Sequence, residues 1–316
     1  MFVYKTLIKR KARKMSKTAF IFPGQGSQYV GMGKDFYDTY SEAKEVFALA
    51  GEASGLDMEK LCFEENEDIN ITEYTQIAML ADEVAILKVL EAKGIKADIT
   101  AGLSLGEYGA LAAADVMDLK DLFHIIRKRG IFMQEAYPVG GAMTAVLGLD
   151  GEKINEICAA TEGIVTVANY NCPGQIVITG EEKAVAAAAQ ALSDAGAKRC
   201  VPLKVSGPFH SELLKGAGEK LGEELKNIEL RNPAIPYISN VNATDVTDKA
   251  PIKELLQNQV SNSVCWQQTI EKMIADGVDT FIEIGPGKTL SGFMRKINKD
   301  VKCINIDKIE DLEKLS

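Results

Sequence analysis

The chain has 316 residues, of which 46% are hydrophobic, so it is long enough for one large domain and a smaller one with buried cores. Its net charge of −9 argues against nucleic acid as the main partner, because binding to phosphates needs a basic field. No apolar run reaches the roughly 18 to 20 residues that cross a bilayer, and the start lacks a secretory signal pattern, so we expect a cytoplasmic protein without a membrane partner.

The first half of the chain alternates between expected strands and expected helices. Residues 1–14 carry six cations and no acid, and we expect them to lie outside the fold, with a functional basic arm as the alternative. The elements expected next are a strand at 18–24, helices from about 29 and around 76–93, a strand at 98–103, and helices from 104 and at 118–136. Such alternation predicts a parallel sheet covered by helices.

The order of expected strands and helices changes after residue 136. Strand, helix, two strands, helix and strand follow one another within residues 137–205, with Pro173 and Gly174 turning the central hairpin. This is the βαββαβ order of ferredoxin-like units. We therefore expect an inserted ferredoxin-like domain at 137–205, within a large α/β-hydrolase-like catalytic domain formed by 15–136 and 206–316. Ligands favour the cleft expected between two such domains.

Ser104 is the candidate nucleophile. It is the serine of G-x-S-x-G at residues 102–106, with a β-like stretch before it and a long apolar helix after it. Flanking glycines permit a sharp turn that exposes the hydroxyl and points the backbone N–H of Leu105 at a developing oxyanion. A serine that simply caps the helix is the alternative reading of this common pattern.

The chain offers only two histidines as a base for this serine, His124 and His210. His124 lies among apolar residues of a predicted helix, which is typical of a core or half-exposed position. His210 follows Gly207, Pro208 and Phe209 in a loop beside the expected cleft, so we expect it to be the base. No single Asp or Glu stands out as the third group that would orient the imidazole.

Two glycine motifs resemble nucleotide sites without matching them. The turn at 22–28 has Tyr29 where the dinucleotide fingerprint needs glycine, and the GKT at 287–289 has Ile282 where a phosphate loop needs glycine. Backbone N–H groups of the first turn can still serve as a second oxyanion donor. The six cysteines lack C-x-x-C spacing, which predicts reduced thiols, and no metal site is expected.

Seven segments in a fixed order closely resemble the malonyl-CoA:acyl carrier protein transacylases and the acyltransferase domains of fatty acid and polyketide synthases. They are FPGQGSQ, GLSLGEY, RGIFMQEA, NYNCPGQIVITG, GPFH, ISNV and IEIGPGKTL, and they lie in the family's order between about residues 18 and 294. The resemblance implies an S-malonyltransferase of fatty acid biosynthesis, with polyketide synthesis as the alternative, that works through a malonyl-serine by a ping-pong mechanism. Malonyl-CoA would be a substrate, acyl carrier protein the acceptor, and no cofactor would be needed; we expect a monomer.

The resemblance also implies roles for individual residues. Ser104 would accept the acyl group and His210 would be its base, while the backbone carbonyl of Gln259 would orient the histidine. Gln25 and Leu105 resemble the residues whose N–H groups form the oxyanion hole. Arg129 is similar to the arginine that pairs with the malonyl carboxylate, and a planar guanidinium suits bidentate binding of a carboxylate.

Two positions, one that departs from the family pattern and one that bears on substrate selection, are specific to this chain's version of it. Leu103 stands where the family usually has histidine, so we expect a changed environment for Ser104 rather than lost activity. Phe209 resembles the malonyl-selecting form of its loop, in which a bulky ring leaves little room for an α-methyl group. A hydrolase with the same serine turn, and an inactive scaffold that only docks carrier proteins, are the rival interpretations.

Overall fold

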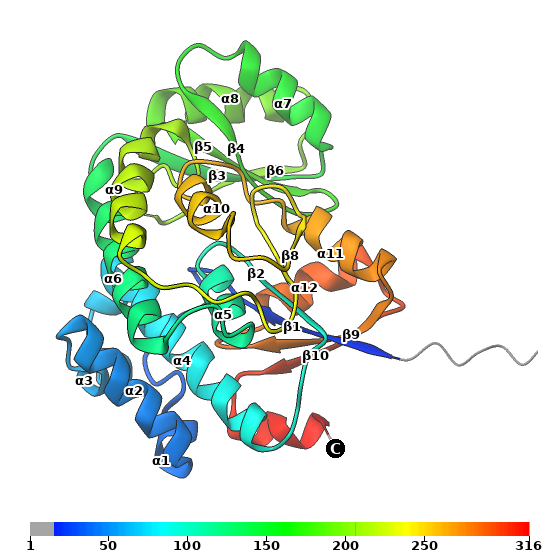
Figure 1. Cartoon of the computed structure of the whole chain (residues 1–316). Coiled ribbons are helices and arrows are strands. Elements are labelled where there is room, and N and C mark those ends of the chain that lie inside the picture. The colour runs from blue at the N-terminus through cyan, green and yellow to red at the C-terminus, as the bar shows by residue number, and fades with distance from the viewer. Residues whose placement is uncertain (1–15, 206, 316) are drawn as a thin grey trace, which may run out of the picture.

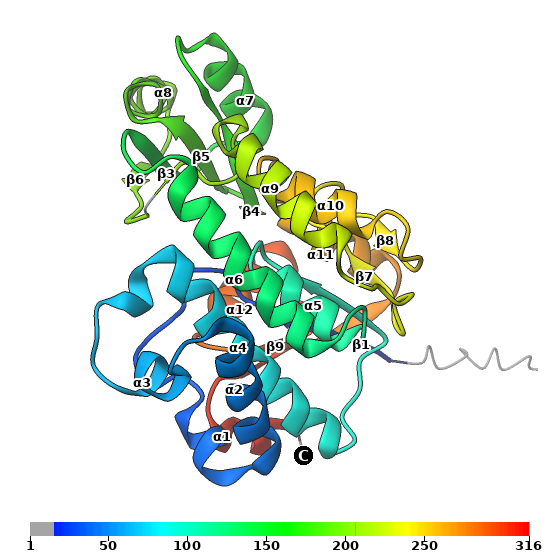
Figure 2. The ribbon, with the colours of Figure 1, turned by 60° about the vertical axis from the view of Figure 1, so that its left-hand side comes forward.

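The computed structural model describes residues 16–205 and 207–315, so the basic segment at 1–14 lies outside the described residues. Two β-sheets organise the described chain. One has six strands in the order β10-β9-β1-β2-β7-β8, and the other has four strands in the order β4-β5-β3-β6. Figure 1 shows the smaller sheet with α7 and α8 above the larger one, and Figure 2 shows α6 and α4 in front of it from a second side.

The six-stranded sheet is parallel except for its last strand. Strands β10, β9, β1, β2 and β7 pair in parallel, whereas β8 pairs antiparallel with β7. The strands are β1 (Lys17–Phe22), β2 (Ile99–Gly102), β7 (Tyr237–Ile238), β8 (Asp245–Val246), β9 (Val278–Ile284) and β10 (Lys302–Ile306). The prediction of a mixed α/β fold with a parallel sheet is confirmed.

Helices cover both faces of this sheet. Alternate residues of a strand point to opposite faces, so the apolar strands place side chains on both faces that must be buried. Phe20 and Phe22 of β1 pack into one core with α4, α5 and α6, while Ala19 and Ile21 pack into another with α11 and α12. The helices of this part are α1 (Lys34–Thr39), α2 (Ser41–Ser54), α3 (Met58–Phe63), α4 (Thr72–Ala92), α5 (Gly106–Ala113), α6 (Leu119–Ala136), α9 (Lys215–Lys226), α10 (Ile252–Gln259), α11 (Trp266–Ala275) and α12 (Thr289–Ile297).

The four-stranded sheet is antiparallel and comes from one continuous stretch of chain. Its strands are β3 (Gly141–Leu147), β4 (Val165–Cys172), β5 (Gln175–Glu181) and β6 (Arg199–Pro202), with α7 (Gly151–Ala160) and α8 (Glu182–Asp194) between them. The helices close a separate small core against the strands, formed by residues such as Val146, Ile154 and Ile178. The tight turn between β4 and β5 lies at Pro173 and Gly174, where Gly174 has a φ of 72°.

Several expected boundaries are wrong. The helix expected from about residue 29 begins at Lys34, because Gly31 and Gly33 adopt positive φ values of 91° and 72° that interrupt a helix. The helix expected from Ser104 begins at Gly106, and Ser104 has a φ of 55°. The edge strand β10 and the helix α2 were not predicted as separate elements. In the part of the chain that the structure describes, we find no helix with the length and hydropathy needed to span a membrane.

Candidate active site

Ser104 lies in a sharp turn between β2 and α5. Close packing makes the flanking glycines necessary, because a Cβ at Gly102 would collide with the backbone of Gly106, and one at Gly106 would collide with the end of β1. The positive φ of Ser104 is a strained conformation for a residue with a side chain. Such strain, held by surrounding structure, is typical of a functional turn.

The structure brings His210 to Ser104. His210 Nε2 lies 2.7 Å from Ser104 Oγ, and His210 Nδ1 lies 2.8 Å from the backbone carbonyl oxygen of Gln259. Because a carbonyl can only accept, Nδ1 carries the proton, and the lone pair of Nε2 faces the serine hydroxyl. The imidazole is therefore oriented by a backbone carbonyl, and a carboxylate is not needed for that task.

The surroundings of His210 keep the imidazole neutral. The side chain is buried, and burial together with the nearby positive charge of Arg129 lowers the pKa of His210 to about 4. The bond to the Gln259 carbonyl acts in the opposite direction, because it favours the charged form. At neutral pH the ring is thus neutral, with Nε2 unprotonated, which is the state a general base requires.

Arg129 reaches the nucleophile from α6. Its guanidinium is buried and donates to Gln76 Oε1 at 2.7 Å, to Gln259 Oε1 at 2.8 Å and to Ser104 Oγ at 3.2 Å. It also lies over the ring of Tyr108, 5.6 Å from the centroid. Burial lowers the pKa of Arg129, but an arginine pKa starts so high that the group stays charged. A fixed cation therefore stands beside the serine hydroxyl.

Three further basic residues of α6, Arg127, Lys128 and His124, contact groups other than Ser104. Arg127 pairs with Glu73 Oε2 at 2.9 Å and stacks over Tyr74, and Lys128 lies 3.5 Å from Glu224. His124 is 41% exposed and lies 3.4 Å from Glu224 Oε2. Spacing alone could not choose between Arg127 and Arg129, and the geometry separates them, because only Arg129 contacts Ser104.

Gln25 and Leu105 lie on the two turns that meet at Ser104. The turn after β1 approaches the serine turn so closely that a Cβ on Gly24 would collide with Leu103. Among the described residues, the backbone N–H groups of Gln25 and Leu105 donate to no protein acceptor. Gln25 is held by its side chain, which donates to Thr72 Oγ1 at 3.0 Å. Both N–H groups are thus available to a negatively charged oxygen.

A cavity of about 210 Å³ opens in front of Ser104 and His210. The turns after β1 and β2 and helix α12 contribute Gln25, Leu103 and Leu290 to its wall, and the small sheet contributes Met143, Asn169, Asn171 and Val177. Phe209 lines the cavity beside His210 and is 6% exposed. Leu103 also lines it, so an apolar side chain occupies the position next to the nucleophile. Its wall, shared between the two sheets, offers a substrate both polar and apolar contacts.

Asn240 and Glu107 were missed as functional residues. Asn240 Oδ1 accepts from the Ser104 N–H at 2.6 Å, and Asn240 Nδ2 donates to the Gly102 carbonyl at 2.6 Å, so one side chain bridges the strained turn. Glu107 Oε2 accepts from Gln259 Nε2 at 2.6 Å. Burial raises the pKa of Glu107 to about 7. Both residues lie in motifs visible in the sequence, GLSLGEY and ISNV, but only their spatial arrangement reveals these contacts.

Nothing in this network favours a metal. Among residues 16–205 and 207–315, no cluster of His, Cys, Asp and Glu has a geometry that could hold a metal ion. The six cysteines are all free thiols.

A serine in a strained turn, hydrogen-bonded to a buried neutral histidine with backbone N–H groups and an arginine beside it, is typical of enzymes that transfer acyl groups through serine. The sequence family described as acyl transferase domain matches residues 19–308. The malonyl CoA-acyl carrier protein transacylase of Bacillus subtilis (strain 168) is 48% identical over 304 residues, which are 95% of this chain and 96% of the relative.

Solved structures agree with the sequence comparison. The malonyl CoA-acyl carrier protein transacylase of Clostridium perfringens superposes with a TM-score of 0.92 at 47% identity, covering 95% of this chain and 96% of that one. A malonyl-transacylase solved in complex with a holo acyl-carrier protein of a type II polyketide synthase gives 0.91 at 40% identity, covering 94% and 98%. The chain belongs to the malonyl CoA-acyl carrier protein transacylase family of acyltransferases.

Proposed function

We propose that this enzyme moves the malonyl group of malonyl-CoA to the phosphopantetheine thiol of an acyl carrier protein through a malonyl ester on Ser104. The contact between His210 Nε2 and Ser104 Oγ, with Arg129 beside the same oxygen, is the observation that carries the proposal. The names of the relatives supply the substrates.

The first half-reaction forms the acyl-enzyme. His210 Nε2 takes the hydroxyl proton as Ser104 Oγ attacks the thioester carbonyl, and the N–H groups of Gln25 and Leu105 stabilise the oxyanion. The carbon–sulfur bond then breaks, and the proton on His210 passes to the leaving thiolate of coenzyme A. Arg129 pairs with the malonyl carboxylate throughout, so the bound acyl group keeps one orientation.

The second half-reaction repeats these steps with the carrier's thiol as the nucleophile. His210 accepts the thiol proton, the sulfur attacks malonyl-Ser104, and the serine leaves with the proton restored. Phe209, in the cavity wall, restricts space beside the α-carbon and disfavours an α-methyl substituent by about 1 to 3 kcal/mol. No cofactor takes part in this cycle, since malonyl-CoA is a substrate and the malonyl thioester of the carrier is the product.

We also propose how the chain divides. The strand order β4-β5-β3-β6 with two helices supports a ferredoxin-like domain at 137–205, inserted in an α/β-hydrolase-like domain formed by 15–136 and 206–316. The cavity walls drawn from both sheets support a site between the two domains. One chain supplies every residue of the proposed mechanism, which supports action as a monomer, and we propose the cytoplasm as its location.

Transfer and hydrolysis are distinguished by following the malonyl group. With malonyl-CoA and a holo acyl carrier protein, malonyl-carrier should accumulate, and free malonate should form far more slowly. Mass spectrometry of the carrier and chromatography of the acids measure the two products. Malonate release at the rate of transfer, in the absence of a carrier, would show a hydrolase instead. Carrier binding without any acyl transfer would show a docking scaffold.

The rate of acylation should depend on pH through His210. Because the base must be neutral and its pKa is lowered to about 4, the rate should stay nearly constant from pH 8 to 5.5 and fall as pH drops through 4. Rapid-mixing measurements of coenzyme A release, with brief exposure to each pH, give this profile. A loss of rate centred near pH 6.5, the ordinary histidine value, would contradict the buried, neutral base.

Asn240→Ala should slow acylation by about 10- to 100-fold. The substitution leaves the buried Ser104 N–H without its acceptor, a loss of about 1 to 3 kcal/mol that relaxes the serine turn. Single-turnover kinetics with malonyl-CoA measure the effect, and Asn242→Ala, at an exposed asparagine two residues away, is the control. An unchanged rate in Asn240→Ala would show that the turn holds its conformation without this contact.

A further inference from the structure

The guanidinium of Arg129 is buried without a carboxylate in contact with it. Arg129 is 1% exposed, and among the described residues its hydrogen-bond acceptors are all neutral: the side-chain oxygens of Gln76, Gln259 and Ser104. Taking a cation out of water is costly unless an anion lies near it. The positive charge of Arg129 therefore needs a partner within the protein when no substrate is bound.

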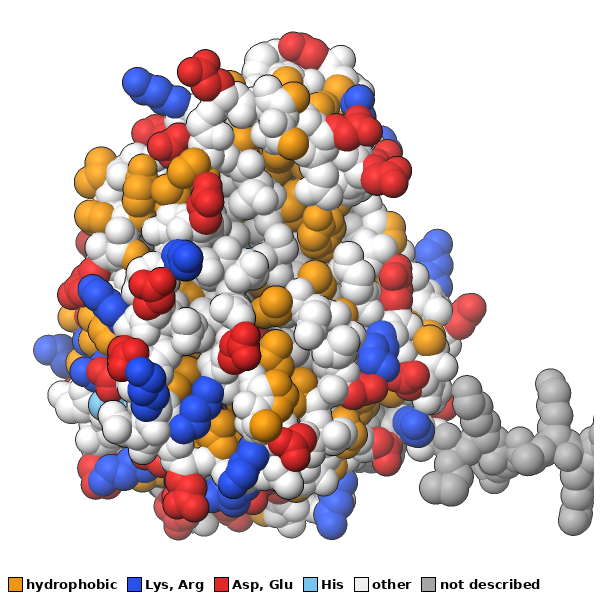
Figure 3. All heavy atoms as spheres, turned by 45° about the horizontal axis from the view of Figure 1, so that its top comes forward, with side chains coloured by type: hydrophobic (Ala, Val, Ile, Leu, Met, Phe, Trp, Pro, Cys, Tyr) orange, Lys and Arg blue, Asp and Glu red, His pale blue; other side chains and the backbone are white. Residues whose placement is uncertain are grey.

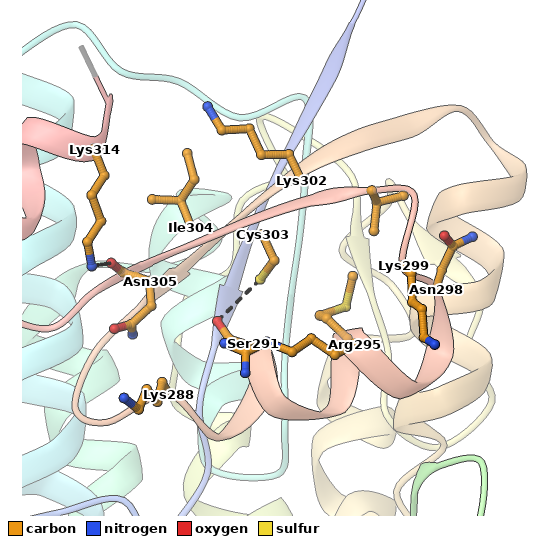
Figure 4. A pocket seen from close by; sticks show the side chains of 12 residues that line it. Lys288, Ser291, Arg295, Asn298, Lys299, Lys302, Cys303, Ile304, Asn305 and Lys314 are labelled. Carbon is orange, nitrogen blue, oxygen red and sulfur yellow. Dashed lines mark hydrogen bonds between the residues drawn. The ribbon is translucent and has the colours of Figure 1, made fainter.

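The exposed cations of this protein do not have the same need, because water solvates them. Figure 3 shows acidic and basic side chains interspersed on one face of the molecule. Figure 4 shows two exposed lysines, Lys299 and Lys302, beside a pocket lined by α12 and β10. Neither of them lines the cavity at Ser104. Among these cations, only Arg129 is both buried and in contact with the nucleophile.

A single amide group connects Arg129 to a buried carboxylate. Arg129 Nη2 donates to Gln259 Oε1 at 2.8 Å, and Gln259 Nε2 donates to Glu107 Oε2 at 2.6 Å. Because a guanidinium only donates and a carboxylate only accepts, these two bonds fix the orientation of the amide. Its oxygen faces the cation and its nitrogen faces the anion, so the two hydrogen bonds strengthen each other.

Glu107 can gain a proton without losing its bond to Gln259. The side chain is fully buried, and Oε2 accepts both of its hydrogen bonds, from Gln259 Nε2 and, at 3.3 Å, from the N–H of Asn240. Oε1 has no hydrogen-bond partner in the part of the chain that the structure describes. A proton on Oε1 therefore leaves Oε2 free to accept as before.

The surroundings of Glu107 allow it to titrate near neutral pH. Burial raises the pKa of Glu107 to about 7, while the hydrogen bonds to Oε2 and the charge of Arg129 act in the opposite direction. The other titratable side chains around it are neutral at this pH. Burial raises the pKa of Tyr108 on α5 and of Tyr237 on β7, and it lowers the pKa of His210.

We propose that Glu107 is the counter-ion of Arg129 in the free enzyme and takes up a proton when the malonyl carboxylate binds, an inference that rests on the proposed function. The arriving carboxylate pairs with Arg129 and cancels the charge that favours ionised Glu107. A proton from solvent then adds to Oε1, and no other bond is made or broken. Glu107 is thus a positioning residue, which acts on the substrate through Gln259 and Arg129.

This coupling makes the affinity for the malonyl group depend on pH. Below pH 7 Glu107 is already protonated, so the malonyl carboxylate enters a site with one positive charge. Above pH 7 binding also requires the uptake of a proton by Glu107, so the affinity falls as the pH rises. The rate at saturating substrate does not change, because Arg129 holds the carboxylate equally before and during acylation.

The test compares malonyl-CoA with acetyl-CoA, which has no carboxylate. The concentration dependence of single-turnover acylation separates each dissociation constant from the rate at saturation. From pH 6 to 8.5, the malonyl-to-acetyl ratio of dissociation constants should rise roughly tenfold in the wild type, if substrate binding raises the pKa of Glu107 by about one. The phosphates of coenzyme A are common to both substrates, so their titration cancels.

Glu107→Gln keeps an acceptor for Gln259 Nε2 but cannot carry the charge, so its ratio should stay constant with pH. Glu83→Gln is the matched control: Glu83 is an equally buried glutamate, on α4, and it does not hydrogen-bond to Gln259. This control should keep the wild-type rise. A wild-type ratio that stayed constant with pH would overturn the proposal, whether or not Glu107→Gln folds. The full rise in a folded Glu107→Gln enzyme would overturn it too.

Proton uptake can also be measured directly. With a pH indicator in weak buffer near pH 7.5, the wild type should take up about half a proton per enzyme with malonyl-CoA and far less with acetyl-CoA. Both substrates release coenzyme A, so the difference comes from the carboxylate. Equal uptake with the two substrates, in an enzyme that forms malonyl-Ser104, would overturn the proposal alone. Failure of the proposed function is distinct, since no malonyl-enzyme would then form.

Discussion

His210→Ala is expected to slow acylation by malonyl-CoA about 10³- to 10⁴-fold. Among the residues that the structure describes, the substitution removes the only group within hydrogen-bonding distance of Ser104 Oγ that can accept its proton, since the other neighbour, Arg129, only donates. Residual activity should come from the oxyanion donors and from substrate binding, which remain. Single-turnover release of coenzyme A measures the rate, and circular dichroism verifies the fold.

His124→Ala is the matched control for that experiment. His124 is the other histidine of the chain, is 41% exposed, and lies near Glu224. The account predicts a wild-type rate for this variant. A His210→Ala enzyme that acylated within tenfold of the wild type would show that another group removes the serine proton.

Arg129→Ala is expected to reverse the preference for charged acyl groups. Without the guanidinium, the malonyl carboxylate would be desolvated without a partner, a loss of about 2 to 5 kcal/mol or at least about 30-fold in acylation. Acetyl-CoA, which has no carboxylate, should lose far less. The measurement is the ratio of malonyl to acetyl acylation rates within each variant. Because both rates fall equally when part of the enzyme is unfolded, the ratio does not change with the amount of folded enzyme.

Two further variants make the arginine test specific. Arg127→Ala removes a cation of the same helix that pairs with Glu73, and it should keep the wild-type ratio. Arg129→Lys keeps the charge but loses the planar fork, so it should fall between wild type and Arg129→Ala. If the malonyl-to-acetyl ratio were unchanged in Arg129→Ala, the carboxylate would be bound elsewhere.

The sequence predicted the order of elements well because hydrophobic periodicity and turn residues are local. The elements of the small sheet follow the expected order within residues 137–205, and the hairpin at Pro173 and Gly174 and α6 lie within a few residues of their expected positions. The errors occur where local signals mislead. Glycines at 31 and 33 delay the first helix, and tertiary contacts, rather than helix propensity, hold Ser104 outside α5.

The site could be predicted only in part. Ser104 and His210 follow from a motif and from the scarcity of histidines, and the resemblance adds Arg129, Gln25, Leu105, Phe209 and Gln259. The contacts between these residues cannot be read from the sequence alone. Gln259, for example, joins its carbonyl to His210 and its side chain to Arg129, Glu107 and the Ser104 carbonyl. These contacts join residues as far apart in the sequence as 104 and 259. The hydrogen bonds by which Asn240 and Glu107 hold them in place are therefore visible only in the folded structure.

Leu103 stands where the family pattern has histidine, and the contacts around it show what this difference changes. Its apolar side chain packs against the turn that carries Gln25 and lines the cavity beside the nucleophile. The hydrogen bonds of Ser104 reach His210, Arg129, Asn240 and Gln259 without using position 103. The missing histidine therefore removes none of these four contacts, and a changed serine environment rather than lost activity stays the prediction.

The central claim is that the malonyl group rests on Ser104 between the two half-reactions. Intact-mass spectrometry after brief mixing with malonyl-CoA tests it, with peptide mapping to locate the added group. The account predicts a mass gain of one malonyl group on the wild type, located on Ser104 and removed by a holo acyl carrier protein, and no gain on Ser104→Ala. A malonyl adduct on Ser104→Ala that the carrier still removes would contradict it.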